Sequence, residues 1–319
     1  MIRVVDNYTN LAYSLQTGQS NLIEGTGLLV GLPLYTNSKY NGMALASGTL
    51  RRLGISELIR KYSRSFSDHG DLNLSTISND TGPQNLRNFS HFLEDTNKVY
   101  RTLPSWSEPD DLMFCLGGEC AMITGEMAAL KRRLNGTPGI LWLDAHGDFN
   151  TPATSPSGFI GGMCLALTCG RGPNLTDEIE KLRPLVSEEN IIHVGSRALD
   201  PEEAKEMQES RLVLRSATEV HRNGVEKTAQ TAAQSLTEHC DWIVCHLDLD
   251  VIDPRMMPAV NFPTSGEALT MEETVTIIGE LQATGKLRIF NIAAYNPMMD
   301  NYNYESGMKI LKLVSSILS

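Results

Sequence analysis

The sequence has too few basic residues for a protein that binds nucleic acid or an anionic membrane. Its 319 residues include 27 Lys and Arg against 38 Asp and Glu, which gives a formal net charge of −11. Binding to a phosphate backbone requires clustered Lys and Arg that displace counterions. We therefore expect no nucleic-acid partner and no membrane partner.

Long apolar runs and targeting signals are also missing. The longest apolar segment, "GLLVGLPLY" at residues 27–35, is far shorter than the roughly 20 residues that a membrane-spanning helix needs. No N-terminal stretch combines a basic start, an apolar run and a small-residue cleavage site. These features lead us to expect a soluble, cytoplasmic protein.

Paired cysteine motifs are absent as well. The six cysteines contain no C-x-x-C spacing, so neither a zinc ribbon nor a thioredoxin-type pair is predicted. Isolated cysteines in a chain of this length are mostly small buried apolar residues. We expect this of most of them, and Cys120 is the exception because of the motif in which it stands.

Short β-rich apolar runs alternate with longer helix-like stretches along the chain. This alternation is typical of βαβ units, in which helices cover both faces of a parallel sheet. The hydrophobic content of 41% is enough for a large core, and we expect one domain over residues 1–319. The expected strands are 26–34, 111–116, 139–144, 190–194, 242–248 and 286–293. The expected helices are 47–62, 84–101, 119–134, 202–210, 225–238, 271–283 and 304–318.

Two of the expected strands lead directly into clusters of strong metal ligands. "LWLDAHGDFN" supplies Asp144, His146 and Asp148, and "DWIVCHLDLDVIDP" supplies Asp248, Asp250 and Asp253. Either cluster alone is equally compatible with a turn or a helix cap. Together, at the carboxyl edge of one sheet, the carboxylates would repel one another strongly unless cations neutralised them. Two divalent ions would do so, and oxygen-rich ligation with one imidazole per site suits Mn²⁺ or a similar metal better than it suits zinc, which favours thiolate-rich sites.

Four segments, in their order and spacing, carry a family resemblance. "DAHGD", "FNTPATSPSG", "GSRALDPEE" and "HLDLDVIDP" together resemble the arginase (ureohydrolase) superfamily of binuclear manganese amidinohydrolases. The resemblance covers about Gly117 to Pro297. It implies a single three-layer α/β/α domain with a mainly parallel sheet of about eight strands, and a metal pair at the carboxyl edge of that sheet.

The resemblance also implies a set of metal ligands and catalytic groups. Asp144, Asp148 and Asp248 would bind one ion together with Cys120, and His146 and Asp250 would complete the second site, with Asp144 and Asp248 as bridging ligands. Two ions about 3.5–4 Å apart would activate a bridging water for attack on an electrophilic carbon. Asp148 and His146 are the expected catalytic residues, and Asp148 would pass the proton of that water to the leaving amine.

Several residues depart from the family pattern. Where the family has Gly-Gly-Asp-His, this chain reads "GGEC", which puts Cys120 at a histidine ligand position and makes iron, cobalt or zinc alternatives to manganese there. A hydrolase of N-hydroxyarginine from D-cycloserine biosynthesis resembles this chain in having a cysteine at that position. Gly161 replaces a proton-shuttle histidine, Ala294 replaces the glutamate that grips the guanidinium, and Phe262 replaces a smaller residue.

Other substrate contacts match the arginases. Asn150 and Ser157, on the long loop 147–163, match positions that hold the substrate α-carboxylate, and Asp200 matches one near the α-amino group. Because Ala294 would leave a buried guanidinium without its counter-charge, we expect a substrate group less cationic than guanidinium, such as a hydroxyguanidine, a formimino group or an acylated group. Glu267 is an alternative source of that acidic group. His193 and His246, in predicted strands, are interpreted as interior histidines.

The predicted function is a metal-dependent hydrolase that cleaves a C–N bond of a guanidino- or amidino-type group on an arginine-like small molecule. Two alternatives stay open: a family member that binds metal and ligand but turns over poorly, and a hydrolase of a non-guanidino amide. The resemblance further implies a homo-oligomer, either a trimer or a hexamer.

Overall fold

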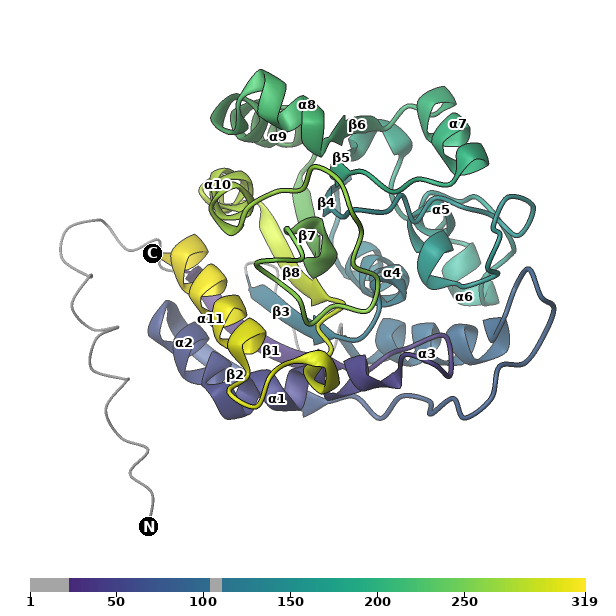
Figure 1. Cartoon of the computed structure of the whole chain (residues 1–319), viewed down its shortest axis with the longest axis horizontal. Helices are drawn as coiled ribbons and strands as arrows, with labels where there is room; N and C mark the ends of the chain where they lie inside the picture. The colour runs from purple at the N-terminus through teal and green to yellow at the C-terminus, as the bar shows by residue number, and fades with distance from the viewer. Residues whose placement is uncertain (1–22, 104–110) are drawn as a thin grey trace, which may run out of the picture.

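The fold is built on one eight-stranded sheet (Figure 1). The computed structural model describes residues 23–103 and 111–319. The strands are β1 (Ile23–Leu32), β2 (Ser63–Asp71), β3 (Leu112–Gly117), β4 (Pro138–Leu143), β5 (Ile191–Ser196), β6 (Val213–Ser216), β7 (Trp242–Asp248) and β8 (Leu287–Ala293). Their order across the sheet is β2-β1-β3-β8-β7-β4-β5-β6, and every pairing is parallel.

The strand order decides which loops meet. Because all strands are parallel, their carboxyl ends lie along one edge, where open α/β sheets bind ligands. At the centre of that edge β3, β8, β7 and β4 are consecutive neighbours. The segments that follow these four strands therefore converge, although they are far apart in the sequence.

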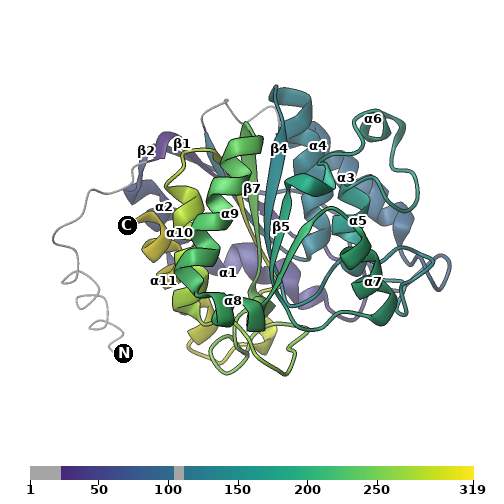
Figure 2. The same ribbon diagram turned by 90° about the horizontal axis from the view of Figure 1, so that it is seen from above.

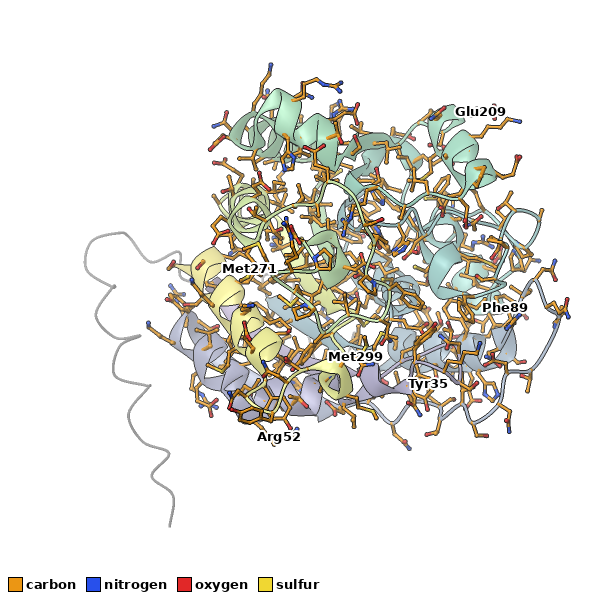
Figure 3. The ribbon with its side chains drawn as sticks, in the orientation of Figure 1. Tyr35, Arg52, Phe89, Glu209, Met271 and Met299 are labelled. Atoms are coloured by element: carbon orange, nitrogen blue, oxygen red, sulfur yellow. The ribbon has the colours of Figure 1, made fainter. Side chains whose placement is uncertain are left out.

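Helices cover both faces of the sheet, as Figures 1 and 2 show. One face packs against α1 (Ala46–Leu53), α2 (Ile55–Lys61), α8 (Ala217–Asn223), α9 (Val225–His239), α10 (Met271–Gln282) and α11 (Glu305–Leu318). The other face packs against α3 (Phe89–Thr102), α4 (Ile123–Arg133), α5 (Cys164–Thr168), α6 (Asp177–Glu180) and α7 (Pro201–Glu209). Figure 3 shows side chains filling both layers, with Met271 of α10 on one side and Phe89 of α3 on the other. This is the expected three-layer α/β/α architecture.

The central strands form because their sequences are apolar on both faces. Every residue of β3, β4, β5 and β7 is buried, as a strand covered by helices on both sides requires. Helix starts are also encoded locally. Ser216 and Thr270 each begin a helix with a capping box that satisfies the first backbone N–H groups.

The six expected strands are all present, whereas β2 and β6 lie outside the prediction. β2 reads "SRSFSDHGD", which does not contain the apolar run on which the prediction depends. It pairs only with β1, at the edge of the sheet. The expected helix 47–62 is wrong as a single element. Gly54 adopts φ +106°, a left-handed conformation that ends α1 and lets α2 begin in a new direction.

None of the helices in the described residues combines the length and apolar character that crossing a membrane requires. The single domain expected over residues 1–319 also includes residues 1–22 and 104–110, which lie outside the described part of the chain. The extent of that domain therefore stays a prediction.

Gly195, near the end of β5, tests the packing at the carboxyl edge. Its φ is +101°, and a Cβ there would lie 2.2 Å from Val251 Cγ2. We expect Gly195→Ala to destabilise the protein by about 2–6 kcal/mol, because backbone strain and overpacking each cost about 1–3 kcal/mol. The measurement is the free energy of unfolding from urea denaturation.

The matched control is Gly279→Ala in α10, where a Cβ would meet nothing within 4 Å. This substitution should stabilise the protein by up to about 1 kcal/mol, because alanine is the better helix former. Equal effects of the two substitutions would contradict the packing seen around Gly195.

Candidate metal centre

The two predicted acidic clusters lie together at the carboxyl edge of the sheet. Asp144, His146 and Asp148 follow β4, while Asp248 ends β7 and Asp250 lies in the next turn, η7 (Leu249–Val251). All four aspartates are buried, and His146 is partly exposed. Because β4 and β7 are hydrogen-bonded neighbours, the clusters meet as the sequence analysis predicts.

Short contacts join the histidine to both clusters. His146 Nδ1 lies 2.9 Å from Asp250 Oδ2 and 3.6 Å from Asp144 Oδ1. One ligand atom from each of these three residues lies within 4.8 Å of the other two, which is a spacing that one ion can bridge. Backbone N–H groups orient the carboxylates: His146 N donates to Asp144 Oδ1 at 2.7 Å, and Asp250 N donates to Asp248 Oδ1 at 2.7 Å.

Cys120 completes the predicted ligand set. It follows β3 in the turn η4 (Cys120–Met122) and is buried. Its Sγ lies 2.9 Å from Asp248 Oδ2 and 3.9 Å from Asp144 Oδ2. Burial raises the pKa of the thiol well above its ordinary value, and the charges of Asp248, Asp148 and Asp144 raise it further. A metal ion would be needed to hold Cys120 as a thiolate.

The electrostatics of the centre favour bound cations. Burial and the charge of Asp250 raise the pKa of Asp248 to about 8, and burial and Asp144 raise the pKa of Asp148 well above its ordinary value. Among the described residues, no Lys or Arg forms an ion pair with the four aspartates, whose ion-pair contacts are those to His146. The nearby Arg197 instead donates to the backbone carbonyls of Asp250 and Val251. Two divalent ions would supply the missing positive charge, so the donor set fits the expected metal pair.

A second set of ligand atoms shares Asp144 with the first. Cys120, Asp144 and His246 each place one such atom within 4.8 Å of the other two, and all three residues are buried. The imidazole of His246 stacks on the Trp142 indole with the ring centroids 3.9 Å apart. Burial lowers the pKa of His246 to about 3, so the ring is neutral at physiological pH. His246 thus lies closer to the metal centre than its interpretation as an interior histidine implies.

Two of the three predicted substrate contacts lie together. Asn150 Nδ2 donates to Asp200 Oδ2 at 3.0 Å, and Asp200 also precedes the first turn of α7, where Glu203 accepts from its backbone N–H. Ser157 makes local contacts within its own loop, accepting from the Phe159 backbone N–H at 3.2 Å. The contacts of Ser157 therefore do not connect it to the Asn150–Asp200 pair.

The positions that depart from the family pattern also lie around the centre. The Phe262 ring stands edge-on to His146 with the ring centroids 6.3 Å apart, and it packs against Tyr40. Ala294 is buried, and its backbone N–H donates to Gly118 O at 2.9 Å, next to the Cys120 turn. Glu267 does not replace the missing glutamate, because it bonds to Thr218 and His221 on α8.

Two further residues beside the centre, Glu119 and Cys164, are not predicted from the sequence. Glu119 is buried and accepts from Thr36 Oγ1 at 2.5 Å and Asn37 Nδ2 at 3.0 Å. A side chain at Gly161 would begin 3.4 Å from Glu119 Oε2, so this carboxylate borders the space left by Gly161. Cys164 Sγ lies 3.5 Å from Asp148 Oδ2. The only sequence signal for Glu119 is its place in "GGEC", and Cys164 has none.

The raised pKa values predict how stability depends on pH once a chelator has removed the metal. The pKa of Asp248 is raised to about 8, and burial raises the pKa of Glu126 to about 7, so both carboxyls keep their protons longer when folded. Their stabilising contribution is present below the unfolded-state pKa and is lost as pH rises through about 7–8. We expect the melting temperature of the metal-free protein to fall between about pH 6.5 and about pH 8.5, as measured by scanning calorimetry.

Added Mn²⁺ should weaken or reverse this trend, because metal binding requires deprotonated ligands. Asp248→Asn should flatten the pH dependence of the metal-free protein. Asp253→Asn is the control, since Asp253 pairs with Arg255 and its pKa is lowered to about 2. A melting temperature that rises with pH in metal-free protein would contradict the electrostatics described above.

Comparison with known proteins places this centre in a family. The family model described as the arginase family matches residues 27–319. The arginase of Bacillus subtilis (strain 168) is 29% identical over 292 residues, which cover 91% of this chain and 96% of that protein. The native structure of the arginase from Bacillus caldovelox superposes with a TM-score of 0.85 and 26% identity, covering 92% of this chain and 98% of that one.

More distant structures share the fold alone. The formimidoylglutamase from Bacillus subtilis superposes with a TM-score of 0.71 at 16% identity, covering 95% of this chain and 88% of that one. The match to the family model spans the strands and turns that carry both acidic clusters. The chain therefore belongs to the arginase family, whose members are metal-dependent hydrolases of amidino groups.

Proposed function

We propose that this protein uses two divalent metal ions to hydrolyse a guanidino- or amidino-type group on a small α-amino acid related to arginine. The observation that carries the proposal is the convergence of four buried aspartates with His146 and Cys120, without a Lys or Arg ion pair to any of the four among the described residues. One histidine beside Asp144 and Asp250 cannot balance four buried carboxylates, and cations would relieve the cost of the remaining charge.

The proposed ligands divide between two ions. Cys120 and Asp148 would bind the first and His146 and Asp250 the second, while Asp144 and Asp248 would bridge them. Manganese is the expected metal for the second site, and the thiolate of Cys120 makes iron, cobalt or zinc alternatives for the first. When bound, the ions supply water activated for attack near neutral pH.

Asp148 and His146 have the proposed catalytic roles. Asp148 is held with φ +49°, and its backbone carbonyl accepts from Leu165 N at 2.9 Å, which fixes the turn after β4. In this position its carboxylate can take the proton of the attacking water and give it to the leaving nitrogen. His146, partly exposed beside the buried aspartates, would orient the substrate carbon while it binds metal.

Water adds to the amidino carbon, and the bond from that carbon to the side-chain nitrogen breaks. The products are an amine and urea, or N-hydroxyurea when the substrate carries a hydroxyguanidine. The proton that Asp148 accepts from water leaves on the amine, so the protein returns to its starting state.

The amino-acid end of the substrate would bind at Asn150 and Asp200. The pair is joined by a 3.0 Å hydrogen bond, and Asn150 Oδ1 is buried without a hydrogen-bond partner among the described residues. An α-ammonium group of the substrate would donate to Asn150 Oδ1 and to the Asp200 carboxylate. A substrate carboxylate would accept from Asn150 Nδ2. Ser157 stays a proposed contact to the carboxylate, although its present bonds are local.

The reacting end favours a group less cationic than guanidinium. Ala294 offers no carboxylate, Glu267 is bonded to α8, and Phe262 makes the wall beside His146 apolar. A hydroxyguanidine or formimino group has a lower pKa than guanidinium and tolerates such surroundings better. Cys120, Gly161 and Ala294 favour the second candidate function, a protein that binds metal and ligand but turns over poorly.

The expected trimer or hexamer and the cytoplasmic location remain part of the proposal. Large apolar side chains are exposed at Met298, Met299 and Tyr302, in the segment that follows β8, and such groups are enriched in subunit interfaces. Figure 3 places Met299 and Tyr35 on the same side of the molecule.

A substrate panel tests the proposed reaction. Metal-loaded protein should release N-hydroxyurea from Nω-hydroxy-L-arginine or formamide from a formimino amino acid clearly faster than it releases urea from L-arginine. Ala294→Glu should shift this preference toward arginine, because a buried carboxylate pairs with the guanidinium cation. Ala294→Gln, with the same shape and no charge, is the control and should not shift it.

Product mass spectrometry and metal analysis distinguish the alternatives. Full metal content without turnover on any substrate would favour the binding protein, and ammonia release from simple amides without urea would favour an amidase. Equal rates on arginine and every modified analogue would contradict the proposed preference.

Asn150 tests the binding of the amino-acid end. We expect Asn150→Ala to raise KM for α-amino-acid substrates by roughly 10-fold or more, with a smaller change in kcat, because the lost contact is present in ground state and transition state alike. Steady-state kinetics on the same panel measure this split. Analogues without the α-carboxylate should be affected less.

Thr154→Ala on the same loop is the matched control. Thr154 Oγ1 accepts from the Thr151 backbone N–H at 2.9 Å, so its loss perturbs the loop without touching the Asn150–Asp200 pair. This substitution should leave KM within about twofold of its original value, because the ground-state contacts to the substrate remain. Similar effects of both substitutions would indicate a general loss of loop structure.

A further inference from the structure

His246 is the one member of the second ligand set that the family resemblance does not assign. Its ring is fully buried in β7, two residues before Asp248. Neither ring nitrogen makes a complete hydrogen bond among the described residues, although the Asn291 side chain on the neighbouring strand approaches the ring. Buried polar atoms are normally paired, so a buried imidazole with an incomplete contact to Asn291 needs an explanation.

The residues around His246 supply this explanation. Cys120 Sγ and a carboxylate oxygen of Asp144 lie within 4.8 Å of one of its nitrogens and of each other. Stacking on Trp142 fixes the plane of the imidazole, and Trp142 Nε1 donates to Asp144 Oδ2 at 3.1 Å. A thiol, a carboxylate and an imidazole from three different segments of the chain therefore converge on one place.

We propose that His246 is a ligand of the metal ion on the Cys120 side, so that it supplies the imidazole that the family motif places at residue 120. This inference rests on the proposed metal pair and identifies one more of its ligands. The imidazole comes from β7 instead of the turn after β3, and the smaller cysteine side chain leaves room for it.

The neighbouring strand provides the support that a histidine ligand needs. Metal-bound histidines usually give their other ring N–H to an acceptor, which fixes the tautomer and the ring orientation. Asn291 pairs in register with His246 on β8, and its Oδ1 is also buried without a partner among the described residues. Its Nδ2 donates to both oxygens of Glu126, at 2.7 and 2.9 Å, which turns Oδ1 away from that carboxylate. A small rotation would let Asn291 Oδ1 accept from His246.

This ligand set changes the expected metal preference. Thiolate and imidazole donors favour cobalt and zinc over manganese, whereas carboxylate oxygens favour manganese. We therefore expect the softer metal, cobalt or zinc, to bind on the Cys120 side. The second ion, held by His146, Asp250 and the bridging aspartates, keeps an oxygen-rich environment.

Cobalt binding tests the assignment directly. Wild-type protein titrated with Co²⁺ should bind two equivalents, and one of them should produce a near-ultraviolet thiolate-to-cobalt absorption band. His246→Gln should lower the affinity for the ion that gives this band by roughly tenfold or more and leave the other ion bound. Mn²⁺ affinity at the same site should fall less than Co²⁺ affinity, because imidazole contributes more to cobalt binding. A merely structural role for His246 would weaken both metals alike.

Two further variants separate coordination from packing. His193→Gln removes another fully buried histidine, whose Nε2 lies 2.7 Å from the His146 carbonyl oxygen, and it should leave the absorption band unchanged. The double variant Cys120→His with His246→Ala should regain the affinity lost in His246→Ala and lack the band. If the double variant binds metal no better than the single one, the proposal is wrong.

X-ray absorption of wild-type protein loaded with two cobalt ions keeps the proposal testable even if the variants fail to fold. It should show about one imidazole per ion on average, whereas His146 alone would give about half of one. Unchanged cobalt binding in His246→Gln would overturn the proposal while leaving the hydrolase function intact. If the spectra are as expected but the protein turns over no substrate, the proposed function is overturned and the assignment of His246 as a metal ligand stands.

Discussion

The mutual repulsion of four buried aspartates is the constraint on which the rest of the site depends. Parallel strands place their carboxyl ends on one edge, so acidic turns after neighbouring strands cannot avoid one another. Burial and neighbouring carboxylates raise the pKa values of Asp148 and Asp248, which means that protons or metal ions must compensate the charge. Near neutral pH, divalent ions would compensate it more completely, and the same ions would supply the activated water that hydrolysis needs.

The core of this fold can be predicted because local sequence and tertiary environment agree. β4 and β7 are apolar on both faces, and each ends where the acidic residues begin. Edge elements lack that agreement. β2 is polar and is held by pairing with β1, and β6 has only four residues, so neither shows an apolar run. The break at Gly54 is equally hidden, since a glycine within a helical pattern is often tolerated.

The metal centre shows the same division. The aspartates and His146 can be predicted because each cluster is contiguous and follows a recognisable strand. Glu119, Cys164 and His246 cannot, because their contacts join segments distant in sequence. A buried strand position such as that of His246 normally indicates packing. That Cys120 and Asp144 lie beside the His246 ring is seen only in the three-dimensional structure.

The departures from the family pattern become coherent when the charges around the centre are considered together. β8 lies between β3 and β7, so Ala294 and the Cys120 turn are neighbours, joined by the hydrogen bond from Ala294 N to Gly118 O. In the proposed metal-bound state, a thiolate at residue 120 would add a negative charge next to the metal ions, and alanine at residue 294 offers no negative charge to the proposed substrate. Relative to the family pattern, negative charge would thereby move from the substrate side to the metal side. If the proposed metal pair binds here, a pocket arranged in this way would hold its ions with softer donors and attract a full guanidinium less, which is the physical reason for proposing a less basic amidino group as the substrate.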